Sequence, residues 1–352
     1  MLKNLTNSHL DRQNILNNPF AAEAILEQTK LKSIVFDDQI WFTTEQVANY
    51  FEVTTRTIQN YLENYEQELR QNGYKIFTGK ELEIAKSVFG NETDFTTKTT
   101  VLGMFNFRSF LNLGMLLTNS EKAKQLRSLV LDIVIGVMNQ KYGQNRKFIN
   151  QNDALYPFAI SQYQNYHQKL NDSLRDYVEM GNTKYIYFND KIYKFLFLEK
   201  YKEYKILLDL KSKEKPINTH YSEVITTIST FETAFAEEIR EKSQGLNRKI
   251  NKNEAETIFD KLIRKQLWQP LLHFSREIIA SRDLGFRNIL HPNLGDQIKP
   301  ISAEEYQRFI SQASLQNPLT EAENQQITEN QTQDLFEQIE QDKNIYKRLK
   351  NK

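Results

Sequence analysis

Four polar side chains at helical spacing form the most specific chemical pattern in the chain. They are Thr55, Arg56, Gln59 and Asn60. Thr54, just before them, is a residue type that caps helices, whereas Ile58 and Leu62 fall on the opposite face of the same helix. Arginine, glutamine, asparagine and threonine side chains hydrogen-bond base edges and phosphates. The pattern therefore predicts a helix that presents a DNA-binding face to solvent.

The residues before this helix predict a partner helix and a tight turn. Thr43 or Thr44 caps the first helix. The apolar side chains of the first helix and the turn are Val47, Ala48, Phe51 and Val53. Two helices at this spacing are typical of a helix-turn-helix, although its turn often carries glycine where this chain has Glu52. The alternative interpretation is a structural or protein-binding unit of the same shape.

A second pattern with chemical potential lies at residues 280–292. In a helix, Arg287 and His291 lie one turn apart on the same face. An Arg-Asn pair followed by a histidine is similar to the ribonuclease signature of HEPN toxins, although the spacing here is one residue shorter than usual. That resemblance implies acid–base catalysis by the histidine and transition-state stabilisation by the arginine. The alternative is a structural salt bridge from Asp283 to Arg287.

Tyrosines and lysines are interleaved between residues 184 and 205. Such a mixture binds nucleic acid by stacking and phosphate contact, or forms a core whose lysines face solvent. The sequence leaves both interpretations open. The tyrosines are Tyr185, Tyr187, Tyr193, Tyr201 and Tyr204, and the lysines are Lys184, Lys191, Lys194, Lys200, Lys202 and Lys205.

The composition excludes several classes of site. The 352 residues include 46 basic and 45 acidic side chains, for a net charge of +1, so any contact with nucleic acid must come from a local patch. The absence of cysteine excludes disulfides, thiolate metal sites and thiol nucleophiles. The 11 glycines form no phosphate-binding loop, and the five histidines form no metal-binding pair. We expect no metal and no cofactor.

The apolar runs are too short or too interrupted by charge for a signal peptide or a membrane span. The longest, Leu126 to Met138, contains Arg127 and Asp132. We therefore expect a cytoplasmic protein without membrane contact.

Hydrophobic periodicity predicts a mainly helical chain with small strands. Gly114 is expected near a helix break, and Ser120 is expected to cap a strong helix. Asn189-Asp190 suggests a hairpin running into a helix. The expected strands are 33–36, 40–42 and 74–77. The expected helices are 44–73, 80–89, a stretch from 102, 120–140, 154–180, 221–242, 253–267 and 271–291.

Residues 35–142 resemble the RhuM virulence-protein family, through the helix-turn-helix and the segments Val101–Gly114 and Ala123–Arg127. The second part is also similar to the Bro-N domain of phage antirepressors. The resemblance implies a DNA-binding protein, often encoded beside restriction–modification or other mobile defence genes. It implies that Arg108, Lys124 and Arg127 face DNA. The alternative for each is an ordinary solvated helix charge.

We therefore expect a mainly α fold with small β-hairpins, comprising an N-terminal (winged) helix-turn-helix and a helical C-terminal domain. The expected parts are an arm at 1–32, a DNA-binding region at 33–143, a helical domain at 150–310 and a flexible tail at 317–352 with a possible terminal helix. The expected partner is double-stranded DNA, bound by a homo-oligomer. The alternatives are a nuclease or toxin acting through Arg287 and His291, and a scaffold that holds a partner protein in a defence complex.

Overall fold

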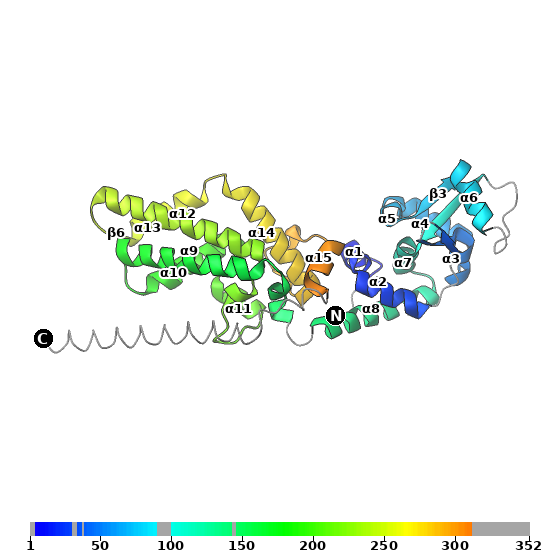
Figure 1. The fold of residues 1–352 in the computed structure, drawn as a ribbon, viewed down its shortest axis with the longest axis horizontal. Coiled ribbons are helices and arrows are strands. Elements are labelled where there is room, and N and C mark those ends of the chain that lie inside the picture. The colour runs from blue at the N-terminus through cyan, green and yellow to red at the C-terminus, as the bar shows by residue number, and fades with distance from the viewer. Residues whose placement is uncertain (1–3, 30–33, 37–38, 90–99, 143–145, 312–352) are drawn as a thin grey trace. The chain divides into compact units, whose positions relative to one another are not determined.

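Helices make up most of the chain, and a small antiparallel sheet lies among the first of them (Figure 1). The computed structural model describes residues 4–29, 34–36, 39–89, 100–142 and 146–311. The mainly helical class predicted from the sequence is confirmed. Within these residues no helix is both long enough and apolar enough to cross a membrane.

In its described residues, the first half of the chain combines eight helices with the four strands of the sheet. The strands run in the order β1-β2-β4-β3, and each neighbouring pair is antiparallel. The helices are α1 (His9–Asn17), α2 (Pro19–Thr29), α3 (Thr44–Tyr50), α4 (Thr55–Asn64), α5 (Glu66–Gln71), α6 (Gly79–Phe89), α7 (Phe107–Leu116) and α8 (Glu121–Tyr142). The strands are β1 (Ile34–Phe36), β2 (Gln39–Thr43), β3 (Lys75–Thr78) and β4 (Val101–Asn106).

Strand β4 corrects the helix expected from residue 102. It pairs with β2 through Trp41 opposite Asn106, and with β3 through Lys75 opposite Met104. The helix α7 begins only at Phe107, because the Asn106 side chain accepts a hydrogen bond from the Ser109 amide and caps it. The six residues of β4 form hydrogen bonds to two strands that are distant in the sequence. The local sequence therefore gives little indication of a strand, and its apolar run suggests part of the helix that follows.

The N-terminal segment, expected as an arm, packs into the first core. Leu5, Ile15, Leu16, Ala21 and Ile25 are buried among the side chains of α3, α7 and α8. α1 and α2 also meet the second half of the chain. The Ile301 backbone amide donates to the Asn14 side chain at 2.7 Å, and the Asn17 side-chain amide donates to the Ile301 carbonyl at 2.6 Å.

The second half is built from helices, with one pair of two-residue parallel strands. The long α9 and α12 pack along each other at its centre. The helices are α9 (Tyr156–Tyr177), α10 (Thr183–Phe197), α11 (Tyr201–Leu207), α12 (Ser222–Leu246), α13 (Lys252–Ile263), α14 (Trp268–Arg282) and α15 (Ala303–Ile310). The strands are β5 (Val178–Glu179) and β6 (Ile250–Asn251), and short 3-10 turns lie at Arg146–Asn152, Pro216–Thr219 and Gly295–Gln297.

Helix α10 replaces the hairpin expected around Asn189-Asp190. Phe188, Ile192 and Leu196 repeat at helical spacing and are all fully buried. Turn-forming residue types inside a strongly amphipathic helix are overruled by the packing of its apolar face, since propensity is a weak determinant of structure.

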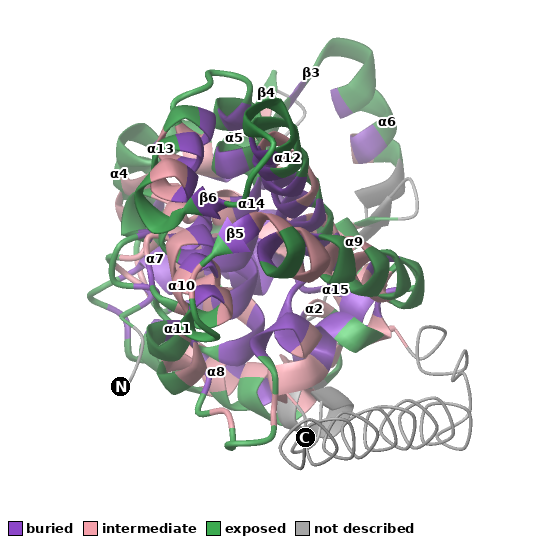
Figure 2. Ribbon diagram, turned by 90° about the vertical axis from the view of Figure 1, so that its left-hand side faces the viewer, coloured by how far each residue is buried: buried purple, intermediate pink, exposed green. Residues whose placement is uncertain are grey.

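The buried residues form two principal cores, one in each half. Figure 2 colours each residue of the ribbon by how far it is buried. The N-terminal core draws on residues from Leu5 to Ile133, and the C-terminal core on residues from Ile149 to Ile310. All described residues up to Ile310 belong to one unit. The end of the expected DNA-binding region at residue 143 and the tail expected at 317–352 lie outside the described residues.

Candidate functional site

Helices α3 and α4 are joined by the four residues 51–54. Each helix has a threonine cap: the Thr43 hydroxyl accepts from the Gln46 amide at 3.1 Å, and the Thr54 hydroxyl accepts from the Thr57 amide at 3.1 Å. The Gln46 side chain also accepts from the Thr43 amide, which completes a capping box. These caps determine where each helix begins, so the four-residue turn has a defined length.

Backbone geometry in the turn gives Glu52 a positive φ of 54°. This is the left-handed conformation, which glycine adopts without strain and other residues adopt at a cost. The position is the one at which the sequence pattern departs from the usual glycine. The chain therefore makes the same turn with a less suitable residue.

The inner faces of α3 and α4 are apolar and closely packed. Val47, Ala48 and Ile58 are at most 2% exposed, and the ring of Phe51 stacks on that of Phe110 with centroids 5.0 Å apart. Gly114 of α7 meets the same ring, because a Cβ there would lie 2.8 Å from Phe51. This packing fixes the orientation of α4 on the N-terminal core.

The outer face of α4 carries the four residues predicted to contact DNA. Thr55, Arg56, Gln59 and Asn60 are all exposed. Within the described part of the chain, none of their side chains makes a hydrogen bond or an ion pair. The first two turns of α4 therefore present two amides, a guanidinium and a hydroxyl that are free to bind a partner.

The beginning of α8 lies next to this unit. The Ser120 hydroxyl donates to the Phe51 carbonyl at 2.7 Å, and the Thr118 amide donates to the Tyr61 hydroxyl at 3.1 Å. Ser120 also caps α8, as predicted, by accepting from the Ala123 amide at 3.0 Å. Lys124 is exposed on the first turns of α8 and pairs with Glu121 at 2.5 Å.

Arg127 and Arg108 have internal partners that the resemblance did not suggest. Arg127 donates to the carbonyls of Gly114 and Leu117, and so satisfies the end of α7. Arg108 donates to the Asn72 side chain at 2.8 Å, and also to Asn17 and the Leu16 carbonyl. Burial lowers the pKa of both guanidinium groups. We therefore leave both arginines out of the DNA-binding face.

The residues of the alternative nuclease site converge on one buried carboxylate. α14 ends at Arg282, a π-helical turn follows at Asp283–Arg287, and Asn288 has a left-handed φ of 59°. His291 thus lies beyond the helix and not one turn along it from Arg287. Asp283 nevertheless accepts from Arg287 at 2.6 Å and lies 2.9 Å from Nε2 of His291.

Every polar atom of this cluster has an internal partner. Nδ1 of His291 lies 3.0 Å from Glu199, and Arg287 also donates to the Thr219 carbonyl and the Asn150 side chain. The side chains of Asp283, Arg287 and His291 are at most 1% exposed. A catalytic histidine needs a ring nitrogen that can exchange a proton with substrate. Both nitrogens are taken here, so the geometry favours the structural alternative.

Burial and the neighbouring charges shift the pKa values of this cluster in opposite directions. Burial raises the pKa of Asp283, but Arg287 and His291 outweigh it and lower that pKa to about 2. Burial lowers the pKa of His291, but its bonds to Asp283 and Glu199 raise that pKa to about 9. Both nitrogens of the imidazole face carboxylates, which is the arrangement of a protonated histidine.

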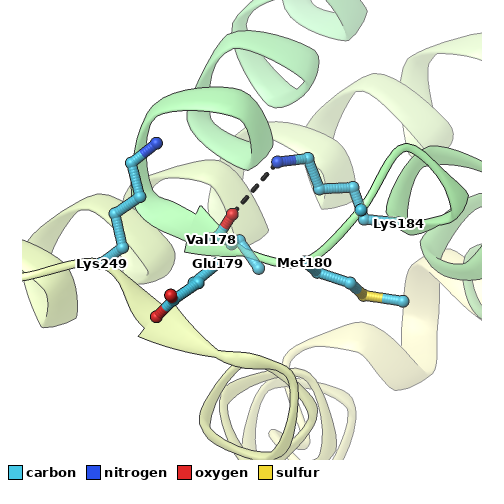
Figure 3. A pocket seen from close by; sticks show the side chains of 6 residues that line it. Val178, Glu179, Met180, Lys184 and Lys249 are labelled. Carbon is cyan, nitrogen blue, oxygen red and sulfur yellow. Dashed lines mark hydrogen bonds between the residues drawn. The ribbon is translucent and has the colours of Figure 1, made fainter.

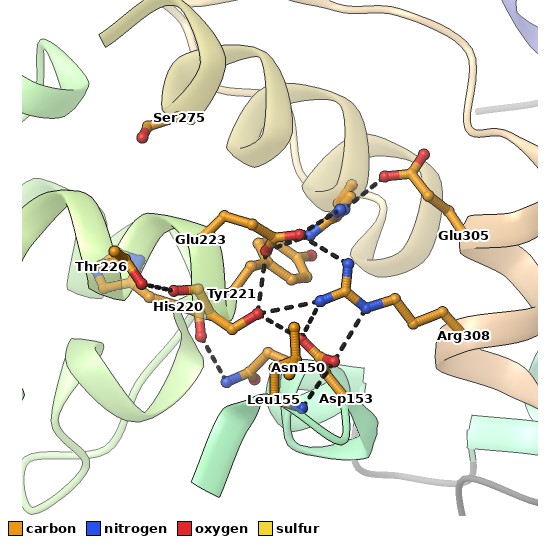
Figure 4. Close-up of polar contacts among 12 residues, drawn as sticks. Asn150, Asp153, Leu155, His220, Tyr221, Glu223, Thr226, Ser275, Glu305 and Arg308 are labelled. Carbon is orange, nitrogen blue, oxygen red and sulfur yellow. Dashed lines mark hydrogen bonds and ion pairs between the residues drawn. The ribbon is translucent and has the colours of Figure 1, made fainter. Parts of the chain in front are cut away.

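A second charge network connects α15 to the start of α12 (Figure 4). Arg308 donates to Asp153 at 3.0 Å and to Glu223 at 2.8 Å. Arg282 bonds the same Glu223 and Glu305. Because each arginine joins two carboxylates from different elements, the network holds α15 against the C-terminal core.

A pocket borders the end of α9 (Figure 3). It has a volume of about 780 Å³ and is lined by Lys184 and Lys249 among others. Lys184 donates to the Val178 carbonyl at 3.1 Å, and Lys249 donates to the Arg175 carbonyl at 3.2 Å. Both ammonium groups thus satisfy the last carbonyls of a helix, where cations are favoured.

Most of the interleaved tyrosines belong to the core. Tyr193 and Tyr204 are buried, and Tyr187 donates its hydroxyl to Glu256. Lys191 pairs with Asp260 at 3.4 Å. These contacts favour the interpretation in which the rings pack inward, although one of the lysines, Lys184, is itself buried.

One arrangement had no signal in the sequence. His167 on α9 lies 3.0 Å from the buried Glu232 on α12, and it also lines a groove between α9 and α10. The two residues are 65 positions apart, so no local motif unites them. The described residues contain no group of three or more acidic or histidine side chains that could hold a metal ion.

Comparisons with protein-family models, with curated proteins and with solved structures returned no match to this chain. The resemblance of residues 35–142 to the RhuM family therefore stays a prediction.

Proposed function

We propose that this protein binds duplex DNA through α3 and α4, which act as a helix-turn-helix with α4 as the recognition helix. One observation carries the proposal: Thr55, Arg56, Gln59 and Asn60 are exposed without internal partners, on a helix whose other face is buried. A solvated structural helix needs no such concentration of base-binding side chains at its N-terminal end.

The placement of these residues suits the major groove. Recognition helices contact base edges with residues near their N-terminus, and the groove is wide enough for one α-helix. The amides at the start of α4 also carry partial positive charge, which favours nearby phosphates. In this proposal Arg56 contacts guanine or phosphate, Gln59 and Asn60 contact base edges, and Thr55 contacts the backbone.

Further phosphate contacts come from the first turns of α8. Lys122 and Lys124 are exposed there, next to the turn that follows α3. With Arg56 they supply three cations. Each phosphate that a cation neutralises adds about −0.9 to the slope of the logarithm of the binding constant against the logarithm of salt concentration. We therefore expect the logarithm of the binding constant to fall with a slope of about −3 against the logarithm of salt concentration.

Strands β3 and β4 follow the two helices in the chain, in the order of a winged helix-turn-helix. We include this wing in the proposal, together with a two-fold dimer in which two copies of α4 read the halves of a palindromic site. The resemblance to the RhuM family predicts the same DNA-binding function, in a defence setting.

The test is binding-site selection from random duplexes, followed by anisotropy titration of the selected duplex. We expect Arg56→Ala with Gln59→Ala to weaken binding by about 30-fold or more, since each base contact contributes about 1–3 kcal/mol. Arg264→Ala with Gln266→Ala is the matched control, because both residues are exposed in the second half of the chain. It removes the same chemical groups and is expected to bind normally.

Both double variants should retain the wild-type melting temperature, because exposed residues without partners contribute little to stability. Lys122→Ala with Lys124→Ala should reduce the salt slope by about 2. Equal binding by the Arg56 and Gln59 variant and its control would refute the recognition-helix assignment. Failure to select any duplex would refute sequence-preferring binding altogether.

A further inference from the structure

Glu232 and His167 form a carboxylate–imidazole pair at the junction of α9 and α12. The carboxylate is 1% exposed, and its two oxygens lie 3.0 and 3.1 Å from Nδ1 of His167. The ring of Tyr163 stacks on the imidazole with centroids 5.0 Å apart. The histidine is thereby held in one orientation, while a third of its side chain stays exposed.

The pair determines the chemistry of the opposite nitrogen. A carboxylate bound at Nδ1 keeps the proton of a neutral imidazole on that nitrogen, so Nε2 carries the lone pair. Among the described residues Nε2 has no partner. His167 therefore offers a fixed hydrogen-bond acceptor at the edge of the groove that it lines.

The groove between α9 and α10 has a volume of about 450 Å³, within the range of small-molecule sites. Asn171 and Asn189 face it from the two helices, and Tyr185 and Ile186 add an aromatic and an apolar surface. Across the residues that the structure describes, neither amide nor the Tyr185 hydroxyl makes a hydrogen bond. Three partly buried polar side chains and one fixed acceptor thus converge on one space.

The charges around the groove disfavour an anion. Arg175 lines it, but its guanidinium is already bound to Asp172 at 2.6 Å and to Asp176 at 2.8 Å. With Glu232 close behind His167, the described residues that line the groove offer no uncompensated cation to receive a phosphate. The groove suits a neutral ligand with several hydrogen-bonding groups.

We propose that this groove binds a nucleoside through its base. Side-chain amides recognise the donor and acceptor edges of bases, an aromatic ring stacks on their faces, and a fixed acceptor takes an N–H or O–H of the ligand. In this site Asn171 and Asn189 bond the edge of the base, Tyr185 packs on its face, and Nε2 of His167 accepts from a donor. This site is distinct from α4 and goes beyond the proposed DNA binding.

The experiment is calorimetric titration of the full chain with the purine and pyrimidine ribonucleosides and with their 5′-monophosphates. Ligand concentrations reach about 1 mM, the weak limit of specific affinity. We expect one nucleoside to bind saturably with one site per chain. Its monophosphate should bind more weakly, because Asp172, Asp176 and Glu232 repel the added charge.

Two variants and one control locate the site. His167→Phe removes the acceptor and Asn189→Leu removes an amide without touching the Glu232 pair, so each should weaken binding about 10-fold or more. His273→Phe is the matched control, since His273 is exposed on α14 beside Glu277 and away from the groove. Its affinity should equal that of the wild type.

Absence of saturable binding by every nucleoside would overturn the proposal. Tighter binding of a monophosphate than of its nucleoside would overturn the assignment of a neutral ligand. Equal affinity in the wild type and Asn189→Leu would overturn the groove as the location, even if His167→Phe proved too unstable to titrate. None of these results bears on duplex binding by α4, so the two proposals fail separately.

Discussion

Raising the pH should selectively weaken the C-terminal core, through His291. Its imidazole is fully buried between Asp283 and Glu199, and these carboxylates hold its pKa at about 9 against an ordinary 6.5. One pKa unit corresponds to about 1.4 kcal/mol, so this difference represents about 3 kcal/mol of folding free energy. That is a large fraction of the total stability of an ordinary domain.

The direction follows from proton binding. Below pH 6.5 the histidine is protonated in both the folded and the unfolded chain, and the ion pairs contribute in full. Between pH 6.5 and 9 only the folded chain retains the proton, so stability declines as pH rises. Above pH 9 the folded chain also loses the proton, and the contribution is gone. Asp283 has the opposite dependence on pH. Because its pKa is about 2, its contribution to the stability of the fold is lost only in acid.

The two tryptophans of the chain allow each core to be followed separately. Trp268 is buried in the C-terminal core, and Trp41 lies in the first half. In a Trp41→Phe background, Trp268 fluorescence reports urea unfolding of the C-terminal core at pH 6, 7, 8 and 9. At each pH, the free energy of unfolding of this protein is compared with that of its His291→Gln variant. The difference removes the contribution of the other titrating groups, which the two proteins share. The stability difference between them should shrink by about 3 kcal/mol over that range.

A constant difference between the two proteins from pH 6 to 9 would refute this reasoning. It would mean that His291 is neutral in the folded chain, with one ring nitrogen unable to donate. The same result would reopen a role for that nitrogen in proton transfer, which the present geometry disfavours.

Four further substitutions test the scaffold. Glu52→Gly should raise the free energy of unfolding by about 1 kcal/mol, since glycine adopts a φ of 54° without strain; a lower value in urea titration would contradict this. Gly114→Ala should lower the free energy of unfolding by about 1–3 kcal/mol, because its Cβ would lie 2.6 Å from Leu126. Gly136→Ala is the control: a Cβ there would have nothing within 4 Å, so the substitution should be neutral or stabilising in the same assay. Arg108→Met should lower the melting temperature while the folded fraction keeps its duplex affinity, and a selective loss of affinity would return this arginine to the DNA-binding face.

The helix pair at residues 43–64 could be predicted because its signals are local. Thr43 and Thr54 begin the helices, and Ile58 and Leu62 mark the buried face within one heptad. The exposure of Arg56 and Gln59 then follows from the helical period. Even the departure at Glu52 was visible, because a left-handed turn position can be recognised from the residue type usually found there.

The sequence is least informative where distant segments decide the structure. β4 forms because β2 and β3 provide partners on both of its edges, and neither is close in sequence. α1 and α2 join the N-terminal core because their apolar side chains fit against α7 and α8. Arg108 appeared to be a surface charge because Asn72 and Asn17, its partners, lie 36 and 91 residues away.

Solvent access separates the two patterns that suggested chemistry. Arg56 and Arg287 are equally plausible from residue type, and each is close to other polar side chains in the sequence. Arg287 lies in a core where Asp283, Thr219 and Asn150 satisfy its donors, whereas Arg56 has no such partners within the described chain. A buried charge must be paired to be tolerated, and pairing removes the donors that a ligand would need. His167 shows the intermediate case, since Glu232 satisfies one nitrogen and leaves the other at a groove. Half-satisfied side chains at a surface are therefore the places where binding is to be sought in this molecule.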